Sequence, residues 1–315
     1  MKVKIGILII MLLTLSSKKD PTPLEGYIEV TGGRIWYRVL GSEPGIPLIV
    51  IHGGPGGSCC GLIKGFTLLA DERPVILYDQ LESGNSDHPE DTTLWKLERF
   101  VEELALLRKA LNLKQYHILG SSWGAAIAVE YLLTQDTSGV KSVIFSGPLL
   151  STKQWISDAK ILLSKLPKGL QDTINKYESL GEFMTPSYIA ATDSFYNRFL
   201  TRRGWPLTNT NPDCINVPGF NEKIYNYMWG PSEFTMRGTL RDFDRTDDLH
   251  KLSQPVLFIV GEYDEVLTGT ACHYKELTPH SEIRITKDAA HSQLGDQPEI
   301  YTETIRQFLK SVESE

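Results

Sequence analysis

The sequence Gly-Ser-Ser-Trp-Gly at residues 120–124 constrains the fold of this chain more than any other feature. It directly follows the apolar run at residues 116–119 and precedes an expected helix over residues 123–133. A serine flanked by glycines at this spacing is typical of a sharp strand-to-helix turn, because the glycines leave no side chain where backbone segments nearly touch. The motif alone could also be an ordinary turn of small residues. The remainder of the chain decides between these two interpretations.

Short apolar runs bounded by turn residues alternate with helical patterns along most of the chain. Continuous apolar runs of this kind are typical of parallel strands that are buried on both faces. A hairpin is expected around residues 31–33. The alternation predicts an α/β fold with a mostly parallel sheet covered by helices. The expected strands cover residues 27–30, 34–40, 47–51, 74–78, 116–119, 140–145, 255–260 and 282–285, and further expected helices cover residues 94–111 and 299–312.

The alternation is interrupted between residues 149 and 249, where the pattern indicates helices and loops. This interval holds 14 of the 30 aromatic residues of the chain. An insertion over the carboxyl ends of the strands fits best, because ligands of such sheets bind there. We therefore expect a core in two parts, residues 24–148 and 250–315, with a largely helical cap at 149–249. Candidate walls of a pocket in this cap are Trp155, Phe195, Trp205 and Trp229.

The first 17 residues have the pattern of a signal peptide. Lys2 and Lys4 precede an apolar run at residues 5–15, which is too short for a membrane-spanning helix. A buried N-terminal strand is the alternative. Residues 15–17 resemble the start of a bacterial lipoprotein box, but Lys18 stands where that box has its lipidated cysteine. We expect an exported protein, periplasmic or secreted, without a lipid anchor.

Composition and charge exclude several classes of function. The net charge is −7 and no basic block is present, so nucleic acid is not an expected partner. The four cysteines form no Cys-x-x-Cys pair, and Cys59 and Cys60 are adjacent. We expect no metal, no other cofactor and no disulfide framework, with the thiols buried or idle.

Chain order identifies a base and an acid for the serine in the 120–124 motif. In folds of this type the nucleophile, the acid and the histidine follow one another along the chain, each after a strand. Among the seven histidines, His291 alone directly follows a late strand, and Asp264 follows the strand before it. We predict a catalytic triad of Ser122, Asp264 and His291.

A serine that attacks a carbonyl group also needs donors for the oxyanion that forms. The backbone N–H of Trp123, beside the serine, is the expected first donor. The second is expected from the sequence His-Gly-Gly-Pro-Gly-Gly at residues 52–57, which follows the strand ending at Ile51. An ordinary glycine turn is the alternative, and His52 itself is expected to be structural.

These motifs together resemble those of the proline iminopeptidases, which are serine peptidases of the α/β-hydrolase fold that release N-terminal residues. The resemblance rests on residues 52–56, 79–86, 120–124 and 261–265 and extends from about Tyr27 to the C-terminus. The cap sequence at residues 228–240 is similar to the tricorn-interacting branch, whose specificity is broader.

The resemblance implies roles for three further residues. Glu233 and Glu265 match two glutamates that hold the free amino group of the substrate, and Gly54 matches the second oxyanion donor. A buried ammonium group needs charge-assisted partners of this kind. The chain departs from the family pattern at residues 79–86, where Leu81 replaces a frequent arginine and Glu82 replaces a glycine.

The first hypothesis is therefore an aminopeptidase acting on short peptides or amino-acid amides. A second is an esterase, lactonase or amino-acid amidase that uses the same triad, and a third is a non-catalytic binding module. The pair Glu233 and Glu265 favours the first, because a neutral ester gains nothing from two carboxylates. Epoxide hydrolases and dehalogenases of this fold require an aspartate in place of Ser122.

Overall fold

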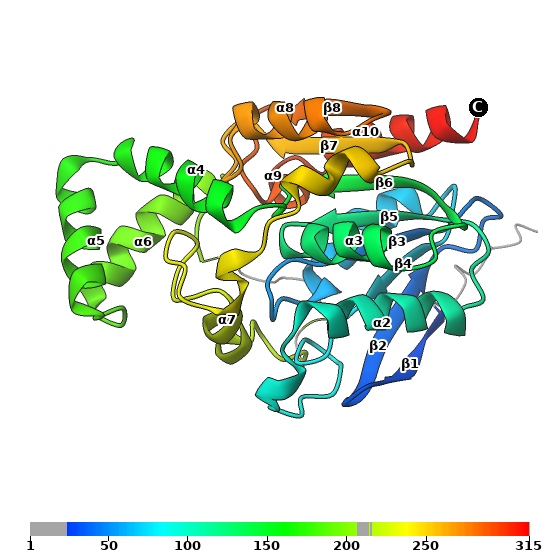
Figure 1. Ribbon diagram of the computed structural model, residues 1–315, viewed down its shortest axis with the longest axis horizontal. Coiled ribbons are helices and arrows are strands. Elements are labelled where there is room, and N and C mark those ends of the chain that lie inside the picture. The colour runs from blue at the N-terminus through cyan, green and yellow to red at the C-terminus, as the bar shows by residue number, and fades with distance from the viewer. Residues whose placement is uncertain (1–23, 207–213, 215, 315) are drawn as a thin grey trace, which may run out of the picture.

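A mostly parallel sheet of eight strands forms the centre of the molecule (Figure 1). The computed structural model describes residues 24–206, 214 and 216–314. The expected signal peptide at residues 1–17 lies outside them. The sheet order is β1-β2-β4-β3-β5-β6-β7-β8, and all neighbours from β4 to β8 are parallel. The strands are β1 Leu24–Val30, β2 Gly33–Leu40, β3 Leu48–Ile51, β4 Val75–Tyr78, β5 Tyr116–Ser121, β6 Val140–Ser146, β7 Val256–Gly261 and β8 Ser281–Thr286.

Helices cover the sheet, and four more in the described part of the chain, α4 to α7, follow one another between β6 and β7. The helices are α1 Ile63–Phe66, α2 Leu97–Ala110, α3 Trp123–Thr134, α4 Thr152–Ser164, α5 Lys168–Leu180, α6 Pro186–Phe199, α7 Glu222–Met228, α8 Thr268–Leu277, α9 Gln293–Asp296 and α10 Pro298–Glu313. The three helices whose bounds were expected, α2, α3 and α10, begin and end close to those positions.

Alternate residues of the buried strands pack into two separate cores. Along β3, Ile49 and Ile51 face the core that contains α2, α3 and α8, whereas Leu48 and Val50 face the core under α1 and α10. This two-sided burial explains why the strands are continuous apolar runs in the sequence. The predicted α/β fold is confirmed.

The chain leaves the sheet after β6 and forms α4 to α7 before it returns at β7. Helices α4, α5 and α6 lie beside the sheet, at the left in Figure 1. They have a small core of their own, in which Phe195 packs against Phe199 and Phe234. The exact bounds of the cap, 149 and 249, remain a prediction.

A disulfide bond between Cys60 and Cys214 joins the core to the segment before α7. The expectation that the cysteines are buried or idle thiols was therefore wrong for Cys60 and Cys214. Cys60 lies in the 3₁₀ helix η1, Cys59–Leu62, and its partner is 154 residues further along the chain. Cys59 and Cys272 are free thiols. Within the described part of the chain, no helix is long and apolar enough to cross a membrane.

Candidate active site

Ser122 lies at the sharp turn between β5 and α3. Its backbone is in a strained conformation, with φ 55° and ψ −119°. A side chain at Gly120 would bring its Cβ to 2.5 Å from the carbonyl oxygen of Gly124, and one at Gly124 would collide with the carbonyl of Ile51. Both glycines are therefore required by the close approach of β3, β5 and α3. The backbone N–H of Ser122 donates to the carbonyl of Ser146 at the end of β6 (2.9 Å).

Asp264, which is buried, and His291 form a pair in the loops after β7 and β8. The Nδ1 atom of His291 is 2.7 Å from Oδ1 of Asp264. The aspartate is held by the backbone N–H groups of Gly261 (2.9 Å) and Val266 (3.1 Å). Because the carboxylate is fixed on both sides, it can orient the imidazole.

The histidine is also held by residues outside the predicted triad. Its backbone N–H donates to the carbonyl of Phe199 at the end of α6 (3.0 Å). The Trp155 ring contacts the imidazole edge-on, with centroids 5.5 Å apart. A Cβ at Gly147 would lie 2.7 Å from the imidazole ring, and Gly147 directly follows the residue that binds Ser122. The fold thus brings Ser122, Asp264 and His291 to one edge of the sheet.

The loop after β3 lies against the serine. A Cβ at Gly53 would be 3.1 Å from Cβ of Ser122, and Gly54 has a φ of 128° that favours glycine. Gln80 connects this loop to α3. Its side-chain amide donates to the carbonyl of His52 (3.0 Å) and accepts from the indole N–H of Trp123 (2.9 Å). The two expected oxyanion donors therefore belong to segments that one buried glutamine joins.

His52 has the structural role that the sequence suggested. Its Nε2 accepts from the backbone N–H of Gln80 (3.1 Å), and burial lowers its pKa. An acceptor role requires the neutral ring.

Glu233 and Glu265 lie close enough to interact electrostatically with each other and with His291. Glu265 is only 2% exposed, and neither of its carboxylate oxygens has a hydrogen-bond partner among the described residues. Burial, followed by the charge of Glu233, holds the pKa of Glu265 well above its usual range. Burial also raises the pKa of Glu233, against a hydrogen bond from the hydroxyl of Tyr225 (2.6 Å) that lowers it.

These carboxylates change the basicity of the histidine. Burial lowers the pKa of His291, but Asp264, Glu265 and Glu233 raise it more strongly, to about 9. Three carboxyl groups therefore surround one imidazole, and one of them has no hydrogen-bond partner among the described residues. Such a site is suited to a cation.

The aromatic candidates of the cap divide into two groups. Trp155 and Trp229 pack edge-on against each other (5.9 Å), and Trp155 also contacts His291. Phe195 belongs to the core of the cap, and Trp205 packs on Tyr196. Trp155 therefore borders His291 and Trp229 supports it from the core, whereas the second pair packs within the cap.

Glu82, which departs from the family pattern, occupies a left-handed position with φ 69°. A glycine adopts this conformation without strain. The glutamate is fully buried, and its carboxylate accepts from the Trp95 indole (3.1 Å) and from the backbone N–H of Glu90 (2.7 Å). These hydrogen bonds offset the strain that the glutamate introduces.

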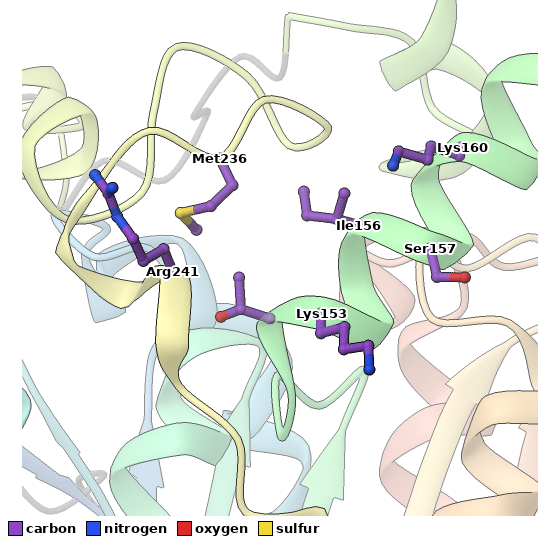
Figure 2. Close-up of a pocket in the computed structure, with 7 residues that line it drawn as sticks. Lys153, Ile156, Ser157, Lys160, Met236 and Arg241 are labelled. Carbon is purple, nitrogen blue, oxygen red and sulfur yellow. The ribbon is translucent and has the colours of Figure 1, made fainter.

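A separate cavity of about 420 Å³ lies between α4 and the segment after α7 (Figure 2). Lys153, Lys160, Met236 and Arg241 are among the residues that line it. None of the predicted site residues lines this cavity. Two other residues of α4 make contacts elsewhere. Trp155 contacts His291, and Asp158 accepts a hydrogen bond from Thr270.

Comparison with known proteins places the chain in a family. A family model described as alpha/beta hydrolase fold matches residues 46–298, which defines the class of protein. The proline iminopeptidase of Heyndrickxia coagulans is 46% identical over 292 residues, which are 91% of this chain and 99% of that protein. The proline iminopeptidase of Saccharolobus solfataricus is 34% identical over 92% of this chain and 93% of its own length. The chain belongs to the proline iminopeptidase family.

A solved structure agrees with this assignment. The crystal structure of the proline iminopeptidase of Mycobacterium smegmatis has a TM-score of 0.83 and 29% identity, and the match covers 92% of this chain and 98% of that one. The resemblance seen in the motifs is confirmed.

The sequence indicated Trp155 only as a candidate pocket wall in the cap, and it did not indicate Tyr225 or Gln80 as parts of the site. Gln80 lies within one of the quoted motifs, but its contacts with both donor segments could not be read from it. Tyr225 and Trp155 reach the site from the cap, and no spacing rule connects them to Glu233 or His291.

Proposed function

We propose that the protein is a serine aminopeptidase that releases N-terminal residues, with proline favoured, from short peptides or amino-acid amides. The observation that carries the proposal is the buried, unpartnered carboxylate of Glu265 beside Glu233 and His291. A buried carboxylate without a partner destabilises the free protein, so a cationic ligand is the simplest reason for it. The names of the relatives support the same activity.

In this proposal the ammonium group of the substrate binds between Glu233 and Glu265. Each charge-assisted hydrogen bond contributes about 1.5–3 kcal/mol. Tyr225 holds Glu233 in position through its hydroxyl. The fixed distance from this pair to Ser122 limits cleavage to the first peptide bond.

The hydroxyl of Ser122 attacks the carbonyl carbon of that bond, and His291 accepts its proton while Asp264 orients the ring. The backbone N–H groups of Trp123 and Gly54 stabilise the oxyanion. His291 then donates the proton to the leaving amine, which leaves an acyl-enzyme on the serine. Water, activated by the same histidine, releases the amino acid.

Substrate binding also prepares the base. In the free protein, the pKa of about 9 keeps His291 largely protonated at neutral pH, where it cannot accept a proton. An ammonium group between Glu233 and Glu265 offsets their negative charge and lowers that pKa. A substrate without the amine lacks this effect.

A panel of substrates tests the proposal. Proline, alanine and leucine arylamides are compared with p-nitrophenyl acetate, and Ser122→Ala is the control for background hydrolysis. We expect cleavage of the arylamides, with proline highest, and its loss in the variant. Efficient hydrolysis of the ester with no cleavage of any arylamide would instead favour the esterase hypothesis.

We also propose that the protein is exported, with residues 1–17 removed and no lipid anchor. The support is the basic and apolar pattern of that segment, together with the Cys60–Cys214 disulfide, since disulfides persist mainly in oxidising compartments. N-terminal sequencing of protein from the native host is the test. A mature chain that still begins at Met1 would contradict export by this route.

A further inference from the structure

The Cys60–Cys214 disulfide lies where the cap meets the oxyanion loop, residues 52–57. On the core side, Cys60 belongs to η1, which follows this loop directly. The start of η1 is anchored because Oδ1 of Asp79 accepts from the backbone N–H of Cys59 (2.8 Å) and from the hydroxyl of Ser58 (3.0 Å). The bridge therefore attaches the cap to a fixed part of the core.

On the cap side, Asn221, directly before α7, contacts the same loop. The backbone N–H of Asn221 donates to the carbonyl of Gly56 (2.9 Å), and its side-chain amide donates to the carbonyl of Glu82 (3.0 Å). A Cβ at Gly56 would lie 2.6 Å from the carbonyl oxygen of Asn221. The contact is thus close and depends on Asn221, which caps α7.

Helix α7 carries Tyr225, whose hydroxyl donates to Glu233. A continuous path therefore leads from the disulfide through Asn221 to one of the two proposed amine-binding carboxylates. Tyr225 also packs with Ile224 and Met228 in the larger core, so the tether adds to this packing in fixing its position.

We propose that the Cys60–Cys214 disulfide is a redox-sensitive tether that holds the amine-binding side of the cap on the oxyanion loop. The inference rests on the proposed aminopeptidase function. Reduction releases the segment, withdraws Tyr225 from Glu233 and weakens the binding of the substrate ammonium. The core triad remains in place, because Asp264 and His291 are held by other loops.

The chemistry of the switch is a thiol–disulfide exchange. A dithiol transfers two electrons and two protons, the bond between the sulfurs breaks, and Cys60 and Cys214 become thiols while the dithiol becomes a disulfide. Cys60 and Cys214 are only 3% and 7% exposed, so the reductant gains access when the segment lifts. The neighbouring Cys59 does not compete, since its thiol is buried and burial raises its pKa.

The tether makes cleavage of peptides depend on whether the disulfide is intact. In an oxidising compartment the cap is closed on the oxyanion loop and amine recognition is complete. Under reducing conditions the same chain recognises N-terminal amines poorly, which limits peptide cleavage before export.

The experiment compares wild type, the double variant Cys60→Ser/Cys214→Ser, and the control Cys272→Ser, which removes a free thiol away from the bridge. KM and kcat are measured for alanine arylamide and for p-nitrophenyl acetate, each before and after dithiothreitol and again after reoxidation. We expect the double variant to raise KM for the arylamide about tenfold, as for the loss of one hydrogen bond to a charged group. The kcat/KM for the ester should change less than about twofold.

Dithiothreitol should reproduce the rise in KM in wild type and in Cys272→Ser but have no effect on the double variant, and reoxidation should restore the wild-type value. If the double variant does not fold, this reversible change in wild type decides the matter. An unchanged KM, or equal losses on the arylamide and the ester, would overturn the tether. Equal cleavage of free and N-acetylated alanine arylamide by the oxidised wild type would instead overturn the proposed function itself.

Discussion

Replacement of Glu265 by glutamine should change activity and stability in opposite directions. The glutamine amide would keep the shape of the side chain but lose the charge that binds the ammonium group. Loss of one charge-assisted hydrogen bond costs about 1.5–3 kcal/mol, so kcat/KM for alanine arylamide should fall about 10- to 150-fold. Part of the loss should appear in KM, since the amine is charged before the reaction begins.

The same substitution should stabilise the free protein above neutral pH. The pKa of Glu265 is raised in the folded state, so the wild type loses stability as the pH rises from the unfolded value through the raised one. Glutamine removes this loss. Removal of a buried, unpartnered charge is worth about 1–3 kcal/mol, which corresponds to a rise in Tm of about 2–6 °C at pH 8. The two proteins should converge in Tm as the pH falls toward 4.

Thermal unfolding at several pH values and steady-state kinetics provide the assay. Glu262→Gln is the matched control, because Glu262 is exposed and its carboxylate accepts from the backbone N–H of Asp288 at the surface. It should change neither Tm nor kcat/KM appreciably. A Glu265→Gln variant with wild-type kcat/KM for the arylamide, or with a lower Tm at every pH, would refute the reasoning.

Three further predictions concern the reacting groups. Ser122→Ala should reduce kcat by a factor on the order of 10⁴ or more while the circular dichroism spectrum is unchanged, and substantial residual turnover would exclude Ser122 as nucleophile. Gly54→Val should reduce kcat by about 10²–10³, because the new side chain would displace the oxyanion donor. A Cβ at this position would lie 2.7 Å from the backbone nitrogens of Gly56 and Gly57. Normal kcat in a folded variant would remove this loop from the mechanism. For an uncharged ester, kcat/KM should rise with pH with a midpoint near pH 9, because only neutral His291 accepts the proton, and a profile with its midpoint near pH 6.5 would contradict the raised pKa.

The sheet and the placement of Ser122, Asp264 and His291 at one of its edges could be predicted because both follow from local patterns. Strands buried on two faces are continuous apolar runs, and the carboxyl ends of parallel strands meet at one edge of the sheet. Ser122, Asp264 and His291 each follow such a strand, so their proximity could be expected without knowledge of the cap. The contacts of Gly120 and Gly124 follow from the same geometry.

The contacts between the cap and the core could not be predicted in this way. The disulfide pairs Cys60 with a cysteine 154 residues away, and which cysteines meet depends on the tertiary position of the cap. The contacts of Tyr225 with Glu233 and of Trp155 with His291 have the same origin. The left-handed backbone conformation of Glu82 could not be predicted either, because the hydrogen bonds that stabilise it come from Trp95 and Asn221 in other segments.

The most direct test of the proposed function compares alanine arylamide with its N-acetylated form on the wild-type enzyme. Acetylation removes the ammonium group but leaves the bond to be cleaved unchanged. If Glu233 and Glu265 bind that ammonium group, kcat/KM for the free substrate should exceed that for the acetylated one by about 100-fold or more. Equal values for the two substrates would contradict the aminopeptidase function and favour a general amidase or esterase.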